Sequence, residues 1–264
     1  MLSILDARAL RVVAALSLAA CAQRTTGLEP APEPIVTDRP DFTESPAIVP
    51  AGMAQLENGY SATREAGVRG QTIGEGLLRV AVAERAEIRL GVNSYATAEA
   101  GPTRATGFED PSVGFKVRLV APGAASSRLV PELSLLGMTT LPSRRGPFRE
   151  STVQPEAKLA AGWEVSERVG FSSNLGYGSA TESQRRFSQL SASGSLGYAV
   201  SARVGAFTEY YGFTAGPGAG LAHYFDGGVT YLLTSNLQLD ARGGAGTNGI
   251  APDRLWGVGL STRW

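Results

Sequence analysis

Apolar and polar residues alternate at every second position along most of the 264-residue chain. In the last segment, 254–264, Trp256, Leu260 and Trp264 share one face with other apolar residues, whereas Arg263 lies on the opposite face. A period of two is typical of a β-strand that buries one face. It recurs in twelve segments, at 53–63, 72–82, 86–96, 111–120, 129–139, 153–164, 168–178, 188–199, 203–213, 221–233, 237–246 and 254–264.

The connections between these segments differ in length. Tight turns lie at 82–86, 165–169, 200–204 and 233–237, and longer connections lie at 97–110, 140–152, 179–187, 214–220 and 247–253. Following the strands up and down the chain puts every tight turn at one end of the molecule. The strands of a soluble β-sandwich also alternate, but a sandwich has no reason to place short connections at one end and long ones at the other. The pattern predicts an all-β fold: a transmembrane antiparallel up-and-down β-barrel of about 12 strands over residues 53–264, with short periplasmic turns and longer extracellular loops.

In such a barrel the apolar faces contact lipid and the opposite faces line the lumen. A charged side chain facing the middle of the membrane costs on the order of 2–4 kcal/mol, and the assigned strands avoid most such positions. The segment 203–213 is the weak case, because Phe207 and Tyr211 share a face with Glu209. Fourteen charged residues are predicted to line the lumen: Glu57, Glu75, Arg79, Glu87, Arg89, Lys116, Arg118, Glu132, Glu156, Lys158, Asp226, Asp240, Arg242 and Arg263. They either form a polar channel or pair with one another and fill the interior.

Residues 1–20 have the features of a bacterial export signal. Arg8 and Arg11 precede an apolar run that is too short to span a bilayer. The run ends in LAAC at 18–21, which resembles a lipoprotein box in which Cys21 is lipidated. The alternative is an ordinary cleavage site that discards Cys21. Both alternatives predict an exported mature protein.

Residues 21–52 form a proline-rich segment between the signal and the first predicted strand, with prolines at 30, 32, 34, 40, 46 and 50. Because proline cannot donate to a ladder or sit inside a helix, this segment is predicted to be a periplasmic arm. Its charged stretch TDRPDFTESP, residues 37–46, could enter the periplasmic mouth and plug the lumen through Asp38, Arg39, Asp41 and Glu44. The alternative is a tether that stays outside the lumen.

Composition argues against several classes of function. The formal net charge is zero, which does not favour a nucleic-acid partner. One cysteine and one histidine are too few for a disulfide framework or a Cys/His zinc site. A barrel hydrolase would depend on His223 alone, and no GxSxG motif accompanies it. We therefore expect a protein without catalytic residues, metal or cofactor.

The predicted outer loops and the last strand suggest macromolecular partners. Guanidinium groups match the phosphates of lipopolysaccharide, although solvated arginines are the ordinary alternative. The last strand presents Trp256, Leu260 and Trp264 on one face and ends on an aromatic residue, which resembles the signal that the barrel-assembly machinery recognises. The loop arginines are Arg144, Arg145, Arg149, Arg185 and Arg186.

Several stretches resemble one family of bacterial outer-membrane proteins, assigned to the meta pathway of phenol degradation and often labelled transporters. The stretches are VTDRPDFTESPAIVPAGMAQLENGY at 36–60, LLRVAVAERAEIRLG at 77–91, EDPSVGFKVRL at 109–119, SLGYAVSARVGAFTEYYG at 195–212, HYFDGGVTYLLTSNLQLD at 223–240 and APDRLWGVGLSTRW at 251–264. The resemblance implies an exported barrel in the outer membrane that passes small organic solutes, aromatic ones by the family label. The alternatives are a closed structural or surface-interaction barrel without a pore and, less favoured, a barrel hydrolase.

Overall fold

The computed structural model describes the chain except for residues 1–32, 124–128, 144–145, 151, 183–184 and 252. The predicted signal peptide, Cys21, Arg144 and Arg145 lie outside the described residues. Within the described part of the chain, no helix is long and apolar enough to cross a membrane.

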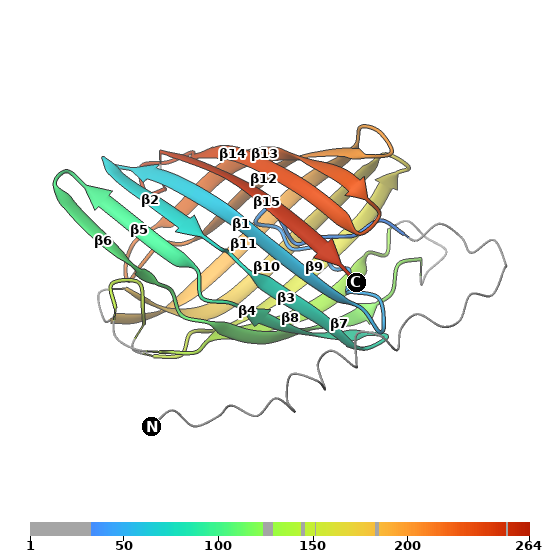
Figure 1. Cartoon of the computed structure of the whole chain (residues 1–264), viewed down its shortest axis with the longest axis horizontal. Helices are drawn as coiled ribbons and strands as arrows, with labels where there is room; N and C mark the ends of the chain where they lie inside the picture. Colours follow the sequence, from blue (N-terminus) through green and yellow to red (C-terminus); the bar gives the residue numbers. More distant parts are fainter. Residues whose placement is uncertain (1–32, 124–128, 144–145, 151, 183–184, 252) are drawn as a thin grey trace, which may run out of the picture. The chain divides into compact units, whose positions relative to one another are not determined.

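Residues 54–263 form a closed antiparallel β-barrel (Figure 1). The strand order follows the chain around most of the wall, and pairing of the last strand with the first, from Gln55↔Arg263 to Arg64↔Arg254, closes it. The described segments are β1 (Ala54–Glu65), β2 (Val68–Ile73), β3 (Leu77–Ala83), β4 (Ala86–Gly91), β5 (Tyr95–Ala100), β6 (Thr103–Phe108), β7 (Ser112–Val120), β8 (Glu132–Thr140), β9 (Pro155–Ser166), β10 (Val169–Glu182), β11 (Arg185–Ala199), β12 (Val204–Thr214), β13 (Leu221–Thr234), β14 (Leu237–Gly246) and β15 (Arg254–Arg263).

These fifteen segments make twelve wall strands, as predicted, because three wall strands are interrupted. β2 and β3 are two halves of one strand, and both pair with β1. In the same way β4 continues into β5, and β6 continues into β7. The interruptions lie at 74–76, 92–94 and 109–111, and the first contains Gly74 with a φ of 75°. The predicted fold class is therefore confirmed.

The predicted long loops at 97–110 and 179–187 are wrong in their extent. β5 and β6 form a hairpin around 101–102, and β10 and β11 run on to 182 and from 185. β1 also extends into a two-residue turn at Ala66 and Gly67, whose φ angles of 46° and 86° suit a tight hairpin. Alternation is hard to see in 95–108 because small residues such as alanine, threonine and glycine give little contrast between the faces. Longer connections do join β8 to β9, β12 to β13 and β14 to β15.

The outer face of the barrel carries large apolar side chains that are exposed to the surroundings. An apolar surface of this extent is unusual for a soluble monomer and suits contact with lipid. The exposed residues that alternate along the strands include Val82, Ile88, Leu90, Val92, Phe115, Leu119, Leu159, Leu175, Tyr177, Leu196, Tyr198, Leu239, Trp256, Val258, Leu260 and Trp264.

The chain end is held against the first strand by a reciprocal pair of backbone hydrogen bonds. Trp264 donates to the Ala54 carbonyl, and Ala54 donates to the Trp264 carbonyl, each over 2.9 Å. The ring of Trp256 packs on that of Tyr60 with the centroids 5.1 Å apart. The side chains of Trp256, Leu260 and Trp264 remain exposed on the outer face.

We predict that Trp264→Asp, or removal of residues 262–264, abolishes accumulation of folded protein in the outer membrane. The substitution puts a charge on the lipid-facing side, and the truncation removes the pairing with Ala54. Heat-modifiable mobility of membrane fractions on gels measures the folded barrel. Trp264→Phe is the matched control and should accumulate normally. Normal levels of folded barrel in the Asp variant would contradict the prediction.

Candidate functional site

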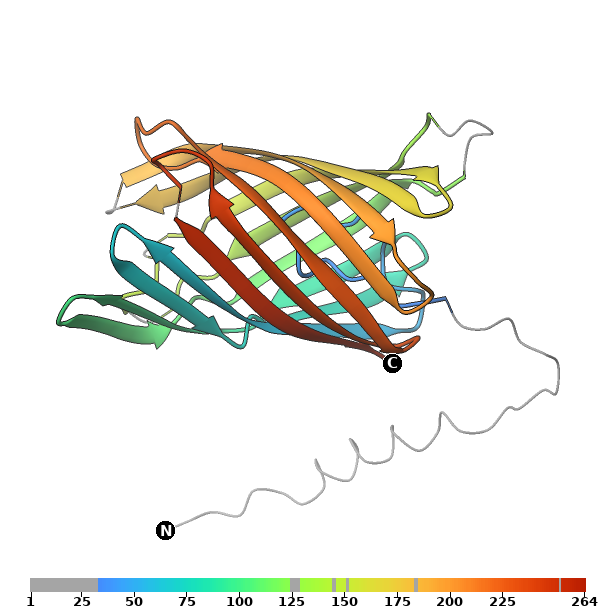
Figure 2. The same ribbon diagram turned by 90° about the horizontal axis from the view of Figure 1, so that it is seen from above.

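An N-terminal arm, residues 34–50, runs inside the barrel before β1 begins (blue in Figure 2). Its four prolines cannot donate to a strand ladder. Wall carboxylates of Glu57 on β1, Glu87 on β4 and Glu209 on β12 accept hydrogen bonds from the arm and replace the neighbouring strand that a sheet would provide. The bonds are Asp38 N and Arg39 N to Glu57 Oε2 at 3.0 Å each, Val49 N to Glu87 Oε2 at 2.8 Å, Phe42 N to Glu209 Oε2 at 2.7 Å and Thr43 N to Glu209 Oε1 at 2.6 Å.

Asp38 lies among three cations of the wall. Its Oδ2 atom lies 3.4 Å from Arg79 Nη1, 2.5 Å from Arg89 Nη1 and 2.9 Å from Lys116 Nζ. These cations come from β3, β4 and β7, which are adjacent in the sheet. Burial alone would raise the pKa of Asp38, but the three cations outweigh it and hold the pKa well below its usual range. The carboxylate therefore stays charged at neutral and mildly acidic pH.

The same cations are shared with carboxylates of the wall. Arg79 Nη1 lies 2.9 Å from Glu57 Oε1, and Arg79 Nε lies 2.8 Å from Glu87 Oε1. Arg89 Nη1 lies 3.1 Å from Glu87 Oε1. All of these side chains are almost fully buried. A buried ion pair is stable only when its charges and hydrogen bonds are completed, and Asp38 supplies the missing carboxylate.

Glu44 joins the cations around Asp38 to the part of the wall formed by β9 and β10. Its carboxylate lies 2.9 Å from Lys158 Nζ on β9 and 2.9 Å from Arg89 Nη2 on β4. Its backbone N–H donates to Asn174 Oδ1 over 2.8 Å, and its carbonyl accepts from Asn174 Nδ2 over 2.9 Å. Burial raises the pKa of Glu44, but Lys158 and Arg89 outweigh it and lower the pKa to about 2. These contacts link the arm to β4, β9 and β10.

Arg39 is held at a third position on the wall. Its Nη1 atom lies 2.7 Å from Glu75 Oε2, and its Nη2 atom lies 3.7 Å from Asp240 Oδ1. The guanidinium occupies space left by two glycines, because a Cβ atom at Gly59 or Gly259 would lie 2.2 Å or 2.6 Å from it. Glycine at these two strand positions therefore makes room for the arm.

Asp41 differs from its three charged neighbours in the arm. Among the described residues it has no ion-pair partner, and it lies near the carboxylates of Glu209 and Asp226. Burial, followed by repulsion from Glu209, raises the pKa of Asp41 well above its usual range. The docked arm therefore favours the neutral form of Asp41.

The fourteen charged residues predicted to line the lumen are all buried or half-buried in the structure. Within the described part of the chain, seven of them hydrogen-bond to the arm, and others pair within the wall. The wall pairs include Arg118 with Glu132 at 2.8 Å and Arg242 with Asp226 at 3.9 Å. The seven that bond to the arm are Glu57, Glu75, Arg79, Glu87, Arg89, Lys116 and Lys158. Asp240 on β14 lies 3.7 Å from Arg39 of the arm, and the remaining members, Glu156 and Arg263, lie in β9 and β15.

An aromatic group that alternation alone does not predict lies inside the barrel. Phe207, Glu209 and Tyr211 on β12 are buried, whereas Thr208 and Tyr210 between them are exposed. The parity of 203–213 was ambiguous because aromatic residues occupy both faces of this strand. In the sequence, the alternate positions of Phe207, Glu209 and Tyr211 indicate that an acidic residue and two rings share one face, which the structure places inside the barrel.

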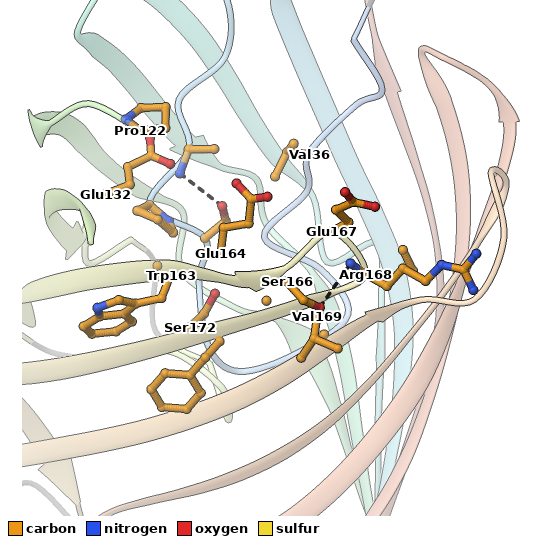
Figure 3. A pocket seen from close by; sticks show the side chains of 18 of the residues that line it. Val36, Pro122, Glu132, Trp163, Glu164, Ser166, Glu167, Arg168, Val169 and Ser172 are labelled. Carbon is orange, nitrogen blue, oxygen red and sulfur yellow. Dashed lines mark hydrogen bonds between the residues drawn. The ribbon is translucent and has the colours of Figure 1, made fainter. Parts of the chain in front are cut away.

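Two cavities flank the arm along the wall formed by β8 to β11. The larger, of about 640 Å³, is bordered by Ser45, Pro46 and Ala47 of the arm and lies at the β9–β10 turn, where Figure 3 shows Glu132, Glu164 and Ser172 around it. The smaller, of about 320 Å³, is bordered by Glu44 of the arm and by residues of β7 to β11 near the other end of the strands. Consecutive arm residues thus border both cavities.

Between the two cavities, the arm packs closely against the barrel wall. A Cβ atom at Gly162 on β9 would lie 2.8 Å from the ring of Pro46. Ser134 Oγ on β8 donates to the Pro46 carbonyl over 2.5 Å. Gly162 and Ser134 therefore let the arm lie directly against the wall.

The other residues singled out by the sequence lie away from the arm. His223 packs its ring on Tyr210, with the centroids 5.8 Å apart, and Tyr210 is exposed on the outer face. Arg149 Nη1 lies 3.4 Å from Asp110 Oδ1, and Arg186 bonds to Ser179. In the described residues no group of His, Cys, Asp and Glu could hold a metal ion.

Fold and interior together define a transmembrane β-barrel of the outer-membrane type, with a peptide arm docked among its inward-facing charges. Residues 37–264 match the family described as the MetA-pathway of phenol degradation, and the chain belongs to this family. No curated protein matches the chain.

Solved structures show the same fold. An outer membrane channel from Pseudomonas putida F1 superposes with a TM-score of 0.58 and 13% sequence identity, over 82% of this chain and 97% of that chain. The NanC porin superposes with a TM-score of 0.54 and 10% identity, over 79% of this chain and 98% of that chain. The barrel fold and the apolar outer face place the protein in the bacterial outer membrane, as predicted.

We predict that Asp38→Asn weakens arm docking at pH 7 and that Asp41→Asn does not. Asp38→Asn breaks a buried ion cluster, at roughly 3 kcal/mol, and should speed amide hydrogen exchange in residues 34–50 by about 100-fold. Asp41→Asn replaces a carboxylate that the docked arm favours in its neutral form, so exchange should slow or stay constant. Hydrogen-exchange mass spectrometry of the arm peptides measures both changes.

The two carboxyls also predict a pH dependence. The raised pKa of Asp41 stabilises the docked arm below its ordinary pKa, and this stabilisation is lost as the pH rises through the raised value. The contribution of Asp38 is lost only as the pH falls through its lowered pKa. Exchange corrected for intrinsic rate should therefore rise in the wild type as the pH increases above 4, and it should rise less in Asp41→Asn. Equal pH profiles for the two proteins would refute this assignment.

Proposed function

We propose that this protein is a non-enzymatic outer-membrane channel for small solutes, and that its passage runs along β8 to β11. The observation that carries the proposal is the pair of cavities separated by arm residues 44–47. Displacement of this short segment joins the two cavities into one path along the wall. In this account the arm is the plug that closes the path.

The size and lining of the barrel support a channel of limited width. Twelve strands lie between the filled small barrels and the water-filled porins of 16 or more strands. The two cavities have a mixed lining, in which carboxylates and hydroxyls such as Glu132 and Ser172 lie beside apolar side chains such as Trp163 and Phe171. Such a lining suits small organic solutes with polar groups. The family description and the likeness to a channel and a porin favour the same class of function.

A closed structural barrel is the second candidate function. The ion cluster around Asp38 favours it, because its charges are paired and almost fully buried. A barrel permanently filled in this way would contact other molecules only through its surface. The separation of the two cavities by so few arm residues favours the channel.

The proposal includes two macromolecular partners, lipopolysaccharide and the barrel-assembly machinery. The exposed Arg185 and Arg186 at the β10–β11 turn supply guanidinium groups for lipopolysaccharide phosphates. The exposed Trp256, Leu260 and Trp264 supply the aromatic face that we propose the assembly machinery reads.

Deleting residues 37–46 tests the channel proposal. The deletion should raise single-channel conductance in planar bilayers several-fold, because it removes Glu44 and the arm residues around it. It also removes Asp38, Asp41 and Glu44 together with Arg39, a net charge of −2. The selectivity of the remaining current should therefore shift towards anions.

Arg104→Gln provides the control for loss of a charge elsewhere. Arg104 forms an exposed ion pair with Glu99, at 3.3 Å, on the β5–β6 hairpin. This variant should keep the wild-type conductance. Heat-modifiable mobility shows that each variant is folded. Unchanged conductance in a folded deletion variant would leave the closed structural barrel as the better account.

A further inference from the structure

A stack of aromatic rings lies inside the barrel beside the ion cluster. Phe42 of the arm lies parallel to Tyr211 on β12, with the ring centroids 4.3 Å apart and an interplanar angle of 7°. Tyr211 lies parallel to Tyr224 on β13, with the centroids 4.6 Å apart. Tyr211 and Tyr224 are buried, and Phe42 packs against their cluster. The wall thus offers a flat aromatic surface that one arm residue covers.

Phe42 makes a second contact close to its ring. Its backbone N–H donates to Glu209 Oε2 over 2.7 Å. Glu209 and Tyr211 lie two positions apart on the inner face of β12, about 7 Å along the strand. Phe42 therefore presents a hydrogen-bond donor to Glu209 and a ring to Tyr211 at the same time.

Asp226 extends the acceptor surface beside Glu209. The two residues are cross-strand partners on β12 and β13. Asp226 is 1% exposed, and its Oδ2 atom lies 3.9 Å from Arg242 Nη1, which is within ion-pair range but too far for a hydrogen bond. Among the described residues, no N–H group donates a hydrogen bond to either of its carboxylate oxygens. A buried acceptor without a donor is unfavourable, so a ligand that brings donors is stabilised at this position.

We propose that Tyr211, Glu209 and Asp226 form a binding site for monocyclic aromatic solutes with ring hydroxyl groups, and that Phe42 occupies this site as an internal competitor. A phenol repeats the two contacts of Phe42, with its ring on Tyr211 and its hydroxyl donating to Glu209. A second, adjacent hydroxyl group donates to Asp226. Aliphatic alcohols lack the stacking ring.

Occupation of the site by a solute displaces Phe42 and loosens the arm next to Glu44. The inference rests on the proposed channel function for the consequence of this displacement, which is opening of the passage. Binding itself requires only the site. Binding and conduction can therefore be tested separately.

Ligand-observed fluorine NMR with 4-fluorophenol tests the site in the full mature protein in detergent micelles. Phe42→Ala removes the competitor and should tighten binding at least fivefold. Tyr211→Leu removes the stacking surface and should weaken binding at least fivefold. Tyr210→Leu changes the neighbouring, outward-facing ring and should leave binding unchanged. Partition of the probe into micelles is common to all variants and cancels in these ratios.

Two further probes test the chemistry of the site. 4-Fluorocatechol should bind the wild type more tightly than 4-fluorophenol, and 4-fluorocyclohexanol should show no binding that depends on Tyr211. Where Phe42→Ala fails to fold, Phe42→Leu keeps apolar volume without the ring and should also tighten binding.

Two results would overturn the site. One is a folded Phe42 variant that binds 4-fluorophenol no more tightly than the wild type, and the other is equal binding by the Tyr211 and Tyr210 variants. Phenol binding in micelles without conductance after arm deletion would contradict the proposed channel and support the binding site. Conductance after arm deletion without phenol binding would support the channel and contradict the binding site.

Discussion

The interior of this barrel depends on the neutralisation of buried charge. Arg79, Arg89 and Lys116 lie together on the inner face, where water cannot solvate them fully. Wall acids supply only part of the countercharge, and Asp38 of the arm supplies the rest through contacts with all three cations. Because a buried cation without a partner is costly, the wall and the arm require one another. A segment without regular secondary structure is thereby given a fixed position.

The outer face of the barrel must be apolar, because it contacts lipid. Apolar side chains point to lipid at every second strand position, and closure of β15 on β1 leaves no unpaired edge at that seam. This arrangement forces polar residues inward, where the space they leave must be filled by water, by solute or by protein. The arm fills part of it, and the two cavities beside β8 to β11 remain. The apolar outer face and the polar inner face therefore both follow from the alternation of residues along the strands.

The strand number and the faces could be predicted from the sequence because they are local, periodic properties. The three interruptions could not be predicted. Those at 74–76 and 92–94 lie inside predicted strands, and the one at 109–111 lies at the end of a predicted loop, because the small residues of the β5–β6 hairpin hid its two strands. The charges of TDRPDFTESP suggested a plug, but its partners lie far away in the sequence. Contacts such as Glu44 with Asn174 or Phe42 with Tyr211 depend on how the barrel closes. No local pattern contains that information.

In the proposed mechanism, movement of the arm away from β10 opens the passage. Replacing Glu44 and Asn174 by cysteines, in a Cys21→Ser background, would place a reducible link where the arm and β10 now share two hydrogen bonds. Uptake of a small solute into proteoliposomes should stop in the oxidised protein and return after reduction. Equal uptake in the oxidised and reduced states of a protein with a verified disulfide would contradict the account.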